Sequence, residues 1–312
     1  MKILVTGGLG FIGSTLSEFL IKNNHSVIVI TRSFSKKNNL TIKSKNLQII
    51  KMNINNFKKF SKLIIDTKPE IIFHLAGETS HYNSFSEPIK EISANIGSTI
   101  CALETIKKHH LKCKFILGST FVTVGKPDKL PVDENSSCHP TSIYGVNKLA
   151  SENLCYVYNR IYNLDTVIFR ITNCFGPKEQ IIPEKNAVNY LIYQAYKKNP
   201  ITLYFQGNFY RDIIFIDDVI AALNILMYKG KSGNLYWISS AKKTWFYKFG
   251  KLLSKHTGSK IVMTPTPKYT KKVDVGNFVA NNCKLRRLGW KPKITNENGI
   301  LITLDYFKKL EP

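Results

Sequence analysis

Tyr144 and Lys148 are the residues of this sequence that are best suited to carry out chemistry. Four residues is about one helical turn, so both side chains are expected on the same face of a helix. There the lysine ammonium would stabilise a tyrosine phenolate, because opposite charges ~4 Å apart interact by roughly 4 kcal/mol at an effective dielectric near 20. A tyrosine with a pKa lowered in this way can act as an acid and as a base near neutral pH.

The spacing alone does not select Tyr144, because Tyr193 and Tyr247 are also followed by a lysine four residues later. The setting favours Tyr144. It begins a predicted helix, and the strand before that helix ends in Gly118-Ser119-Thr120, which supplies hydroxyl groups. We therefore expect Tyr144 and Lys148 to lie beside this cluster of hydroxyl groups.

The start of the chain predicts a strand, a tight turn and a helix. Residues 3–5 are an apolar run typical of a buried strand, and apolar residues recur with helical spacing from Ile12 to Leu20. Three glycines lie in the turn and the first helical turn: Gly7, Gly10 and Gly13. Such glycines allow a sharp turn and close approach to a pyrophosphate, which the helix N-terminus attracts. Ser14 follows where a P-loop would carry lysine, so the pattern favours a dinucleotide site over a nucleoside triphosphate site.

The end of the second predicted strand, residues 27–30, bears on the choice of cofactor. An acidic residue there would bind a ribose 2′-hydroxyl, whereas an arginine accommodates a 2′-phosphate. Thr31 occupies the acidic position and Arg32 follows it. The sequence therefore favours NADP(H), with NAD(H) as the alternative.

Further strands at residues 47–50, 71–75, 115–117 and 167–169 alternate with helical stretches. This alternation predicts an α/β fold with a doubly wound parallel sheet of the Rossmann type. In such sheets ligands bind at the carboxyl ends of the strands. The small residues Ala76 and Gly77, after the fourth strand, would let a ligand approach closely.

The composition narrows the class of protein. The chain has 312 residues, 43% of them hydrophobic, and a formal net charge of +24. Its lysines are dispersed without a long basic block, which argues against a nucleic-acid partner and leaves a basic surface suited to an anionic substrate. Six scattered cysteines without ligand spacing predict reduced thiols and no metal site. No run predicts a signal peptide or a membrane span, so we expect a soluble cytoplasmic protein.

Taken together, the motifs resemble the extended short-chain dehydrogenase/reductase superfamily, in particular its NAD(P)-dependent nucleotide-sugar epimerases and dehydratases. The resemblance covers nearly the whole chain. It rests on Thr6-Gly-Gly-Leu-Gly-Phe-Ile-Gly13, His74-Leu-Ala-Gly77, Asn95-Ile-Gly-Ser-Thr99, Pro140-Thr-Ser-Ile-Tyr144-Gly-Val-Asn-Lys148, Asn173-Cys-Phe-Gly-Pro177, Arg211-Asp-Ile-Ile-Phe-Ile-Asp-Asp-Val219 and Leu288-Gly-Trp-Lys-Pro292.

The resemblance implies roles for individual residues. Thr120, Tyr144 and Lys148 would be catalytic, and Thr120, Asn173 and Arg211 would contact a nucleoside-diphosphate sugar. For Arg211 a salt bridge with Asp212, Asp217 or Asp218 is the alternative. The residues implied to bind the cofactor are Gly7, Gly10, Phe11, Ile12, Gly13, Thr31, Arg32, Asn53, Ile54, Leu75, Ala76, Gly77, Asn95, Tyr144 and Lys148.

The resemblance also implies a division of the chain. Residues 1–175, with returning segments at about 211–238, would form the cofactor-binding domain. Residues 176–312 would mainly form a smaller C-terminal lobe that binds the sugar nucleotide. A homodimer is expected as well.

One departure from the family pattern bears on the reaction. Dehydratases of this group carry Thr-Asp-Glu where this chain has Thr120-Phe121-Val122. Without those two acids, removal of water from the sugar lacks an acid/base pair. We therefore expect an oxidoreductase acting at C4 of the hexose, either an epimerase or a 4-keto-sugar reductase. The alternatives are a non-catalytic NAD(P)-binding sensor and an interaction protein on the same fold.

Overall fold

A parallel β-sheet forms the centre of the protein. The computed structural model describes residues 1–35, 39–77, 85, 87–183 and 186–311. Within these residues the sheet has seven strands in the order β11-β6-β5-β4-β1-β2-β3, and every neighbouring pair is parallel. Its strands are β1 (Lys2–Thr6), β2 (Ser26–Thr31), β3 (Leu47–Lys51), β4 (Ile71–His74), β5 (Lys114–Thr120), β6 (Thr166–Ile171) and β11 (Asn234–Ile238). The predicted doubly wound parallel sheet is confirmed.

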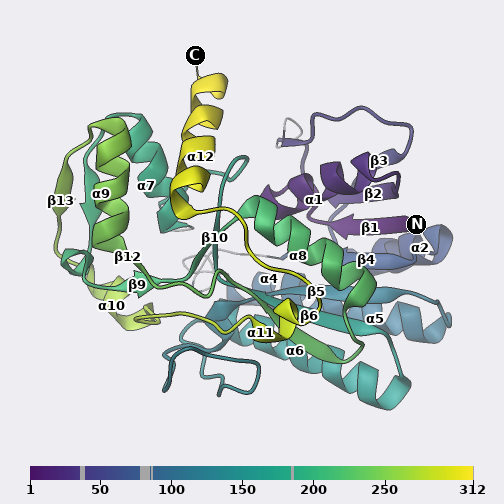
Figure 1. Cartoon of the computed structure of the whole chain (residues 1–312). Helices are drawn as coiled ribbons and strands as arrows, with labels where there is room; N and C mark the ends of the chain where they lie inside the picture. The colour runs from purple at the N-terminus through teal and green to yellow at the C-terminus, as the bar shows by residue number, and fades with distance from the viewer. Residues whose placement is uncertain (36–38, 78–84, 86, 184–185, 312) are drawn as a thin grey trace.

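Helices cover both faces of this sheet (Figure 1). Because successive strand residues point to opposite faces, Ile3 and Val5 pack with one apolar cluster and Leu4 packs with the other. The first cluster includes residues of α1 (Phe11–Lys22) and α8 (Ile216–Lys229), and the second includes residues of α2 (Phe57–Thr67), α5 (Ser98–Lys108) and α6 (Ile143–Tyr162). The sheet is thus buried on both sides, as its near-continuous apolar strands indicate.

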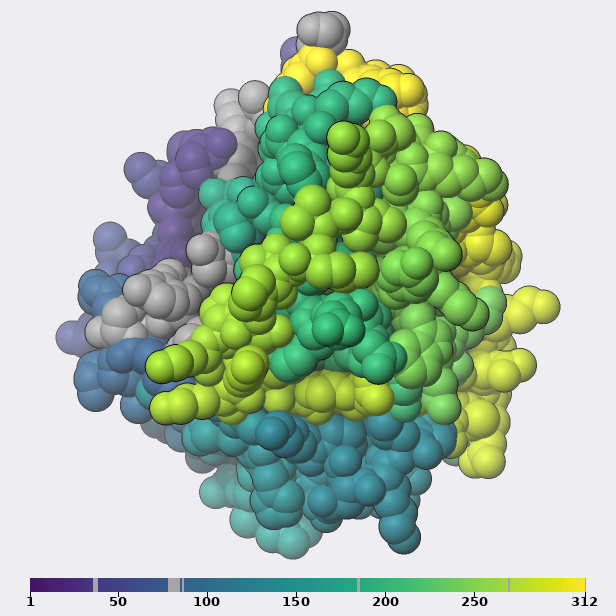
Figure 2. Space-filling view, turned by 90° about the vertical axis from the view of Figure 1, so that its left-hand side faces the viewer, coloured from purple at the N-terminus to yellow at the C-terminus, as the bar shows by residue number. Residues whose placement is uncertain are grey.

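Short elements and a smaller lobe complete the described chain. Between β4 and α5 lie α4 (Pro88–Ile92) and the π-helix η2 (Ser93–Gly97), and η3 (Phe121–Thr123) follows β5. Three two-stranded sheets pair β7 (Asn173–Phe175) with β10 (Ile213–Phe215), β8 (Ile201–Leu203) with β13 (Ile261–Met263), and β9 (Tyr210–Arg211) with β12 (Thr244–Trp245). The remaining elements are η4 (Phe205–Gly207) and the helices α7 (Ala187–Tyr196), α9 (Phe246–Thr257), α10 (Lys268–Val273), α11 (Cys283–Arg286) and α12 (Asn296–Leu310). Figure 2 views the side that carries β13 and α10, in light green.

The strand order reverses between β1 and β4, and this reversal sets the place of the site. From β1 the chain proceeds to β2 on one side, whereas β4 lies on the other side of β1, with Thr6 level with His74. The loops after these two strands therefore diverge and leave a crevice at the carboxyl edge of the sheet. The glycine turn and the Leu75–Gly77 segment border this crevice.

Three further features can be checked on the described residues. All six cysteines are free thiols. No group of three or more His, Cys, Asp or Glu side chains lies close enough to hold a metal ion within the described chain. Among the helices of that same part, none has the length and apolar character that crossing a bilayer requires.

Candidate active site

A cavity of about 630 Å³ occupies the crevice at the carboxyl edge of the sheet. Its size is within the range of small-molecule and cofactor sites. The structure brings nearly all of the sequence-predicted site residues to its wall, and Arg211 is the exception. The residues in the wall are Gly7, Gly10, Phe11, Ile12, Gly13, Thr31, Arg32, Asn53, Ile54, Leu75, Ala76, Gly77, Asn95, Thr120, Tyr144, Lys148 and Asn173.

The glycine turn has the geometry that a pyrophosphate requires. Gly7 has a φ of +69°, and its carbonyl accepts a hydrogen bond of 2.9 Å from the Gly10 amide. A Cβ at Gly13 would lie 2.3 Å from the Gly7 oxygen, so only glycine permits the helix to start this close to the turn. Gly10 precedes α1 at the N-cap position in an extended conformation, and no side chain caps the helix. The N-terminal amides of α1 therefore face the cavity as donors for an anion.

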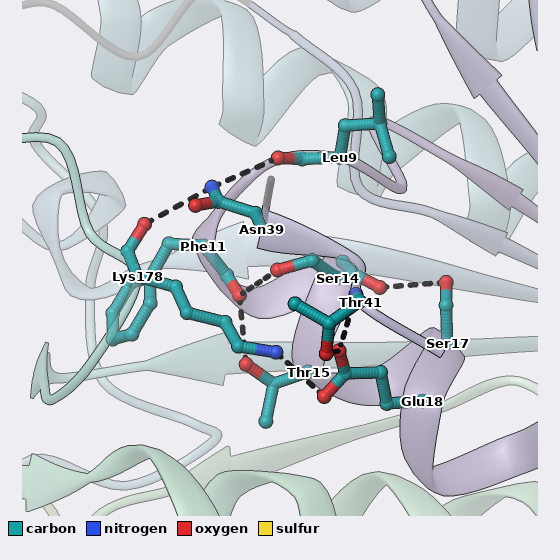
Figure 3. Close-up of polar contacts among 10 residues, drawn as sticks. Leu9, Phe11, Ser14, Thr15, Ser17, Glu18, Asn39, Thr41 and Lys178 are labelled. Atoms are coloured by element: carbon teal, nitrogen blue, oxygen red, sulfur yellow. Dashed lines mark hydrogen bonds and ion pairs between the residues drawn. The ribbon is translucent and has the colours of Figure 1, made fainter. Parts of the chain in front are cut away.

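Polar contacts hold a second segment beside the glycine turn (Figure 3). The Asn39 amide donates to the carbonyls of Leu9 and Lys178, at 3.2 Å in both cases. The Lys178 ammonium lies 2.6 Å from the Glu18 carboxylate on α1, which also accepts a 3.0 Å bond from the Thr41 amide. These bonds join α1, the chain after β2 and the loop after β7. The cavity mouth is therefore bordered by segments that are tied together.

A buried histidine orders the loop after β4. His74 Nδ1 lies 3.2 Å from the Thr6 hydroxyl and Nε2 lies 2.9 Å from the Ser98 hydroxyl. The Thr6 oxygen also accepts bonds from the amides of Leu75 and Ala76. Burial, with a contribution from the charge of Lys148, lowers the pKa of His74 to about 3. The imidazole is therefore neutral and fixes the segment that lines the cavity.

The helix that carries Tyr144 begins where it can meet the end of β5. The Ser142 hydroxyl caps α6 by accepting a bond from the Gly145 amide. A Cβ at Gly145 would lie 3.0 Å from the Val122 carbonyl, so the glycine lets α6 approach η3 closely. The Thr120 hydroxyl is within hydrogen-bonding distance of the Tyr144 phenol. Thr120, Tyr144 and Lys148 thus share one wall of the cavity.

The electrostatics of the pair differ from the sequence-based expectation. Burial raises the pKa of Tyr144, the nearby Glu91 carboxylate raises it further, and the bond with Thr120 lowers it only in part. Lys148 is not among the groups that act on this phenol. Burial lowers the pKa of Lys148 itself to about 8, against the opposing effect of Glu152. Tyr144 is therefore a neutral phenol at neutral pH. The expected lowering of its pKa by Lys148 is absent because burial penalises the phenolate.

The predicted cofactor-choice residues lie at the end of β2. The Thr31 hydroxyl donates to the Ser33 carbonyl at 2.7 Å. Arg32 lines the cavity together with the hydroxyl-bearing residues Ser33 and Ser35. Asn53 and Ile54, after β3, line the same end of the cavity. Among the described residues, this end offers the Arg32 cation and several hydroxyl groups, and β2 contributes no acidic side chain.

Arg211 does not line the cavity. Its guanidinium donates to the carboxylate of Asp274 and to the Gly276 carbonyl, both in the chain after α10, and only 8% of the residue is exposed. The salt bridge does not involve the acids adjacent in sequence. The Asp212 carboxylate instead accepts bonds from the amide and hydroxyl of Ser240 and from the amides of Ala241 and Ala280. The partner of Arg211 lies 63 residues away in the sequence, so no local pattern identifies it.

Several residues of the site were not predicted from the sequence. The loop after β7 adds Glu179, Gln180 and Ile182 to the cavity wall. Asn173, which was predicted, lies in the wall and donates to the Asp212 carbonyl at 3.3 Å. Glu152 lies outside the cavity wall and acts electrostatically on Lys148. Its position four residues after Lys148 on α6 is a signal that could have identified it.

Comparisons with known proteins agree with this geometry. The family model described as GDP-mannose 4,6 dehydratase matches residues 4–303. The UDP-glucose 4-epimerase of Thermotoga maritima, solved with UDP-glucose, is 31% identical, covers 100% of both chains and has a TM-score of 0.92. The UDP-glucuronic acid 4-epimerase of Bacillus cereus, solved with UDP-glucuronic acid and NAD, is 29% identical, covers 99% of this chain and 100% of its own, and has a TM-score of 0.87.

The similarity extends to a second activity. The dTDP-glucose 4,6-dehydratase of Salmonella typhimurium is 27% identical, over 98% of this chain and 92% of its own. Three observations agree on the family of this chain. The family model matches almost the whole chain, the central sheet is of the Rossmann type, and the cavity holds a glycine turn beside a Tyr-Lys pair. The chain belongs to the NAD-dependent epimerase/dehydratase family of the extended short-chain dehydrogenases/reductases, whose members are nucleotide-sugar epimerases and dehydratases.

Proposed function

We propose that this enzyme is a nucleotide-sugar 4-epimerase that acts on a nucleoside-diphosphate hexose. The observation that carries the proposal is the presence of Thr120, Tyr144 and Lys148 in the wall of the cavity that the glycine turn also borders. The two solved relatives above that are at least 29% identical act on UDP sugars at C4. A UDP-hexose is therefore the proposed substrate class.

The same residues fit a nicotinamide dinucleotide. The uncapped N-terminus of α1 would hold its pyrophosphate, Asn53 and Ile54 would flank its adenine, and Lys148 would bind its ribose near the nicotinamide. When bound, this cofactor supplies a hydride acceptor and donor and adds a positive charge to the site.

Tyr144 performs the proton transfers in the proposed reaction. As a phenolate, which the positive charge of the oxidised cofactor would favour, it takes the proton of the 4-hydroxyl when C4 is oxidised. As a phenol it returns a proton to the 4-keto oxygen when C4 is reduced. Thr120, which is hydrogen-bonded to Tyr144, orients the same sugar oxygen. Epimerisation also requires that the planar 4-keto sugar present its other face before reduction. The loop after β7 would border the sugar during this movement.

The residues after Thr120 argue against a dehydratase. Phe121 and Val122 occupy the positions at which dehydratases of the family carry Asp and Glu, and both line the cavity. Neither side chain can donate or accept a proton. Removal of water across C5 and C6 therefore lacks its acid/base pair, and C4 stays the proposed centre of the reaction.

A 4-keto-sugar reductase is the second candidate. It is favoured by Arg32, Ser33 and Ser35 at the end of β2, which suit the 2′-phosphate of NADP(H). A reductase consumes NADPH and must exchange the oxidised cofactor after each turnover, whereas an epimerase regenerates its cofactor in each cycle. The Bacillus cereus relative was solved with NAD, which favours the epimerase.

The reaction can be tested with the purified protein and no added reductant. We expect UDP-glucose or UDP-glucuronic acid to be converted to a mixture with its 4-epimer, followed by proton NMR of the anomeric signals. A 4-keto-6-deoxy product would instead identify a dehydratase. Turnover only of a 4-keto sugar, and only with NADPH, would identify the reductase. No turnover of any of these sugars would favour a cofactor-binding sensor.

The bound nucleotide gives a second, independent test. The protein is denatured and any released nucleotide is identified by mass and amount. Near-stoichiometric NAD would support the epimerase and contradict the argument from Arg32. An empty site that takes up NADPH in preference to NADH would support the reductase.

We also infer a homodimer, as the family resemblance implies. The helices α5 and α6 lie side by side on one face of the sheet and expose apolar side chains there, including Ile100, Val157 and Ile161. Exposed apolar side chains on two neighbouring helices suit contact with a second copy. Sedimentation velocity should give twice the mass of 35.6 kDa, and a mass of one chain would contradict the inference.

A further inference from the structure

A buried carboxylate lies one helical turn after Lys148. Glu152 on α6 is fully buried, and its two oxygens accept bonds of 3.0 and 2.6 Å from Nε and Nη2 of Arg170 on β6. It also accepts the hydroxyl of Ser119 on β5. A carboxylate buried this deeply needs such partners to replace the hydrogen bonds that water would supply. Glu152 thus joins α6 to the two central strands whose ends carry site residues.

Glu152 follows Lys148 by four residues on the same helix. Residues four apart on a helix have neighbouring side chains, so Glu152 and Lys148 lie on the same face of α6. Lys148 is itself buried, with 6% of the residue exposed, and an isolated ammonium would lose its proton there. We propose that Glu152 is a positioning residue that keeps Lys148 charged and that fixes the end of β5 beside Tyr144. The proposal rests on the proposed function, because it assigns a role to the same Tyr-Lys pair.

The other groups around Lys148 do not replace this carboxylate. His74 on β4 is neutral, and the buried Cys155 on α6 has its pKa raised, so neither offers a negative charge at neutral pH. Glu91 on α4 acts on Tyr144 and is not among the groups that act on Lys148. Arg170 is a cation and opposes the charge of the lysine. Glu152 is therefore the group that favours the ammonium, in agreement with its effect on the pKa of Lys148.

Glu152 also connects the lysine to the sugar-binding side. Ser119 precedes Thr120 in the chain, so the bond from Ser119 to Glu152 anchors the strand end that presents the Thr120 hydroxyl. Arg170 is itself held over the ring of Trp237, with its guanidinium carbon 5.5 Å from the ring centroid. The carboxylate is thus fixed from the side away from the cavity.

The test measures the charge of Lys148 directly. In protein labelled with ¹³C at the lysine ε-carbon, the Lys148 signal is assigned by its absence in Lys148→Met and titrated with pH. In Glu152→Gln we expect the Lys148 pKa to fall by about one unit, because a nearby opposite charge in a buried site shifts a pKa by roughly this amount. The alkaline limb of the kcat profile should move to lower pH by a similar amount.

A matched control variant tests whether the change in the Lys148 pKa is specific to Glu152 or follows from the loss of any hydrogen-bonded glutamate. Glu104 on α5 also accepts bonds from a lysine and a tyrosine, Lys107 and Tyr158, and lies outside the cavity wall. Glu104→Gln should leave the Lys148 titration unchanged. If Glu152→Gln does not fold because Arg170 is left unpaired, Glu152→Gln combined with Arg170→Met removes both charges and is often tolerated.

The outcomes are distinct. A Lys148 pKa in folded Glu152→Gln that equals that of the wild type would overturn the proposal, as would a double variant whose Lys148 pKa equals that of Arg170→Met alone. The NMR titration needs no substrate. A protein without epimerase activity whose Lys148 pKa nevertheless falls in Glu152→Gln would refute the proposed function and leave the electrostatic role of Glu152 intact.

Discussion

Replacement of Tyr144 by phenylalanine removes one hydroxyl from the proposed proton donor and acceptor. The ring is 9% exposed and stays packed, so the change should cost only the hydrogen bond with Thr120, about 1 kcal/mol of net stability. The catalytic cost should be larger. Proton transfer by a positioned side chain contributes about 10²–10⁴-fold, which corresponds to roughly 2.7–5.4 kcal/mol of the activation barrier.

The assay compares turnover with folding and cofactor binding in the same preparations. We expect kcat for 4-epimerisation to fall at least about a hundredfold, while the melting temperature and the Kd for NAD stay close to those of the wild type. Tyr193→Phe is the matched control. Tyr193 also precedes a lysine by four residues, but its hydroxyl bonds to Glu311 at 3.2 Å, and Tyr193 is not in the cavity wall. This control should retain full turnover.

Three results would contradict the reasoning. A Tyr144→Phe protein that retained a third or more of the wild-type kcat would show that another group moves the proton. Equal losses in Tyr144→Phe and Tyr193→Phe would show that the spacing of tyrosine and lysine, and not the place in the cavity, determines the effect. Loss of cofactor binding in Tyr144→Phe would point to a structural role for the hydroxyl.

Three further predictions concern the cofactor and the lysine. Arg32→Ala should weaken NADP(H) binding relative to NAD(H), and an unchanged ratio of the two Kd values would remove the argument from Arg32. Gly13→Ala should abolish cofactor binding measured by calorimetry, because its Cβ would lie 2.3 Å from the Gly7 oxygen; normal binding would contradict the close approach. Activity should fall as the pH rises through about 8, because Lys148 is charged below its pKa and neutral above it. A profile flat to pH 10 would contradict that assignment.

The sequence predicted the fold and most of the site because both depend on local patterns. Apolar runs identified the strands of the sheet, and the glycines at Gly7, Gly10 and Gly13 can meet a pyrophosphate only in one kind of turn. Ser142 and Gly145 then fix where α6 begins, so Tyr144 reaches the end of β5. Each of these features depends on residues that are close together in the chain.

Long-range partners were not predicted. Arg211 pairs with Asp274, and Asn39 reaches Lys178 across 139 residues. No spacing rule connects such positions, and a charged residue has many possible partners of opposite sign. The sequence therefore offered the neighbouring acids as partners for Arg211, and the tertiary fold selected a distant one.

The error in the expected pKa of Tyr144 has a physical cause that also explains the role of the buried carboxylates. A helical Tyr-Lys pair in water would stabilise a phenolate, but burial opposes every charge in the site. It raises the pKa of Tyr144 and lowers that of Lys148 to about 8. At neutral pH the phenol therefore holds a proton ready for a 4-keto oxygen, and removal of a proton from a 4-hydroxyl needs added positive charge. An oxidised nicotinamide cofactor would add that charge, and Lys148, which would hold the cofactor's ribose, is charged only because Glu152 opposes the effect of burial. The buried carboxylate behind the pair, and not the spacing of tyrosine and lysine, therefore determines the pH at which the pair can work.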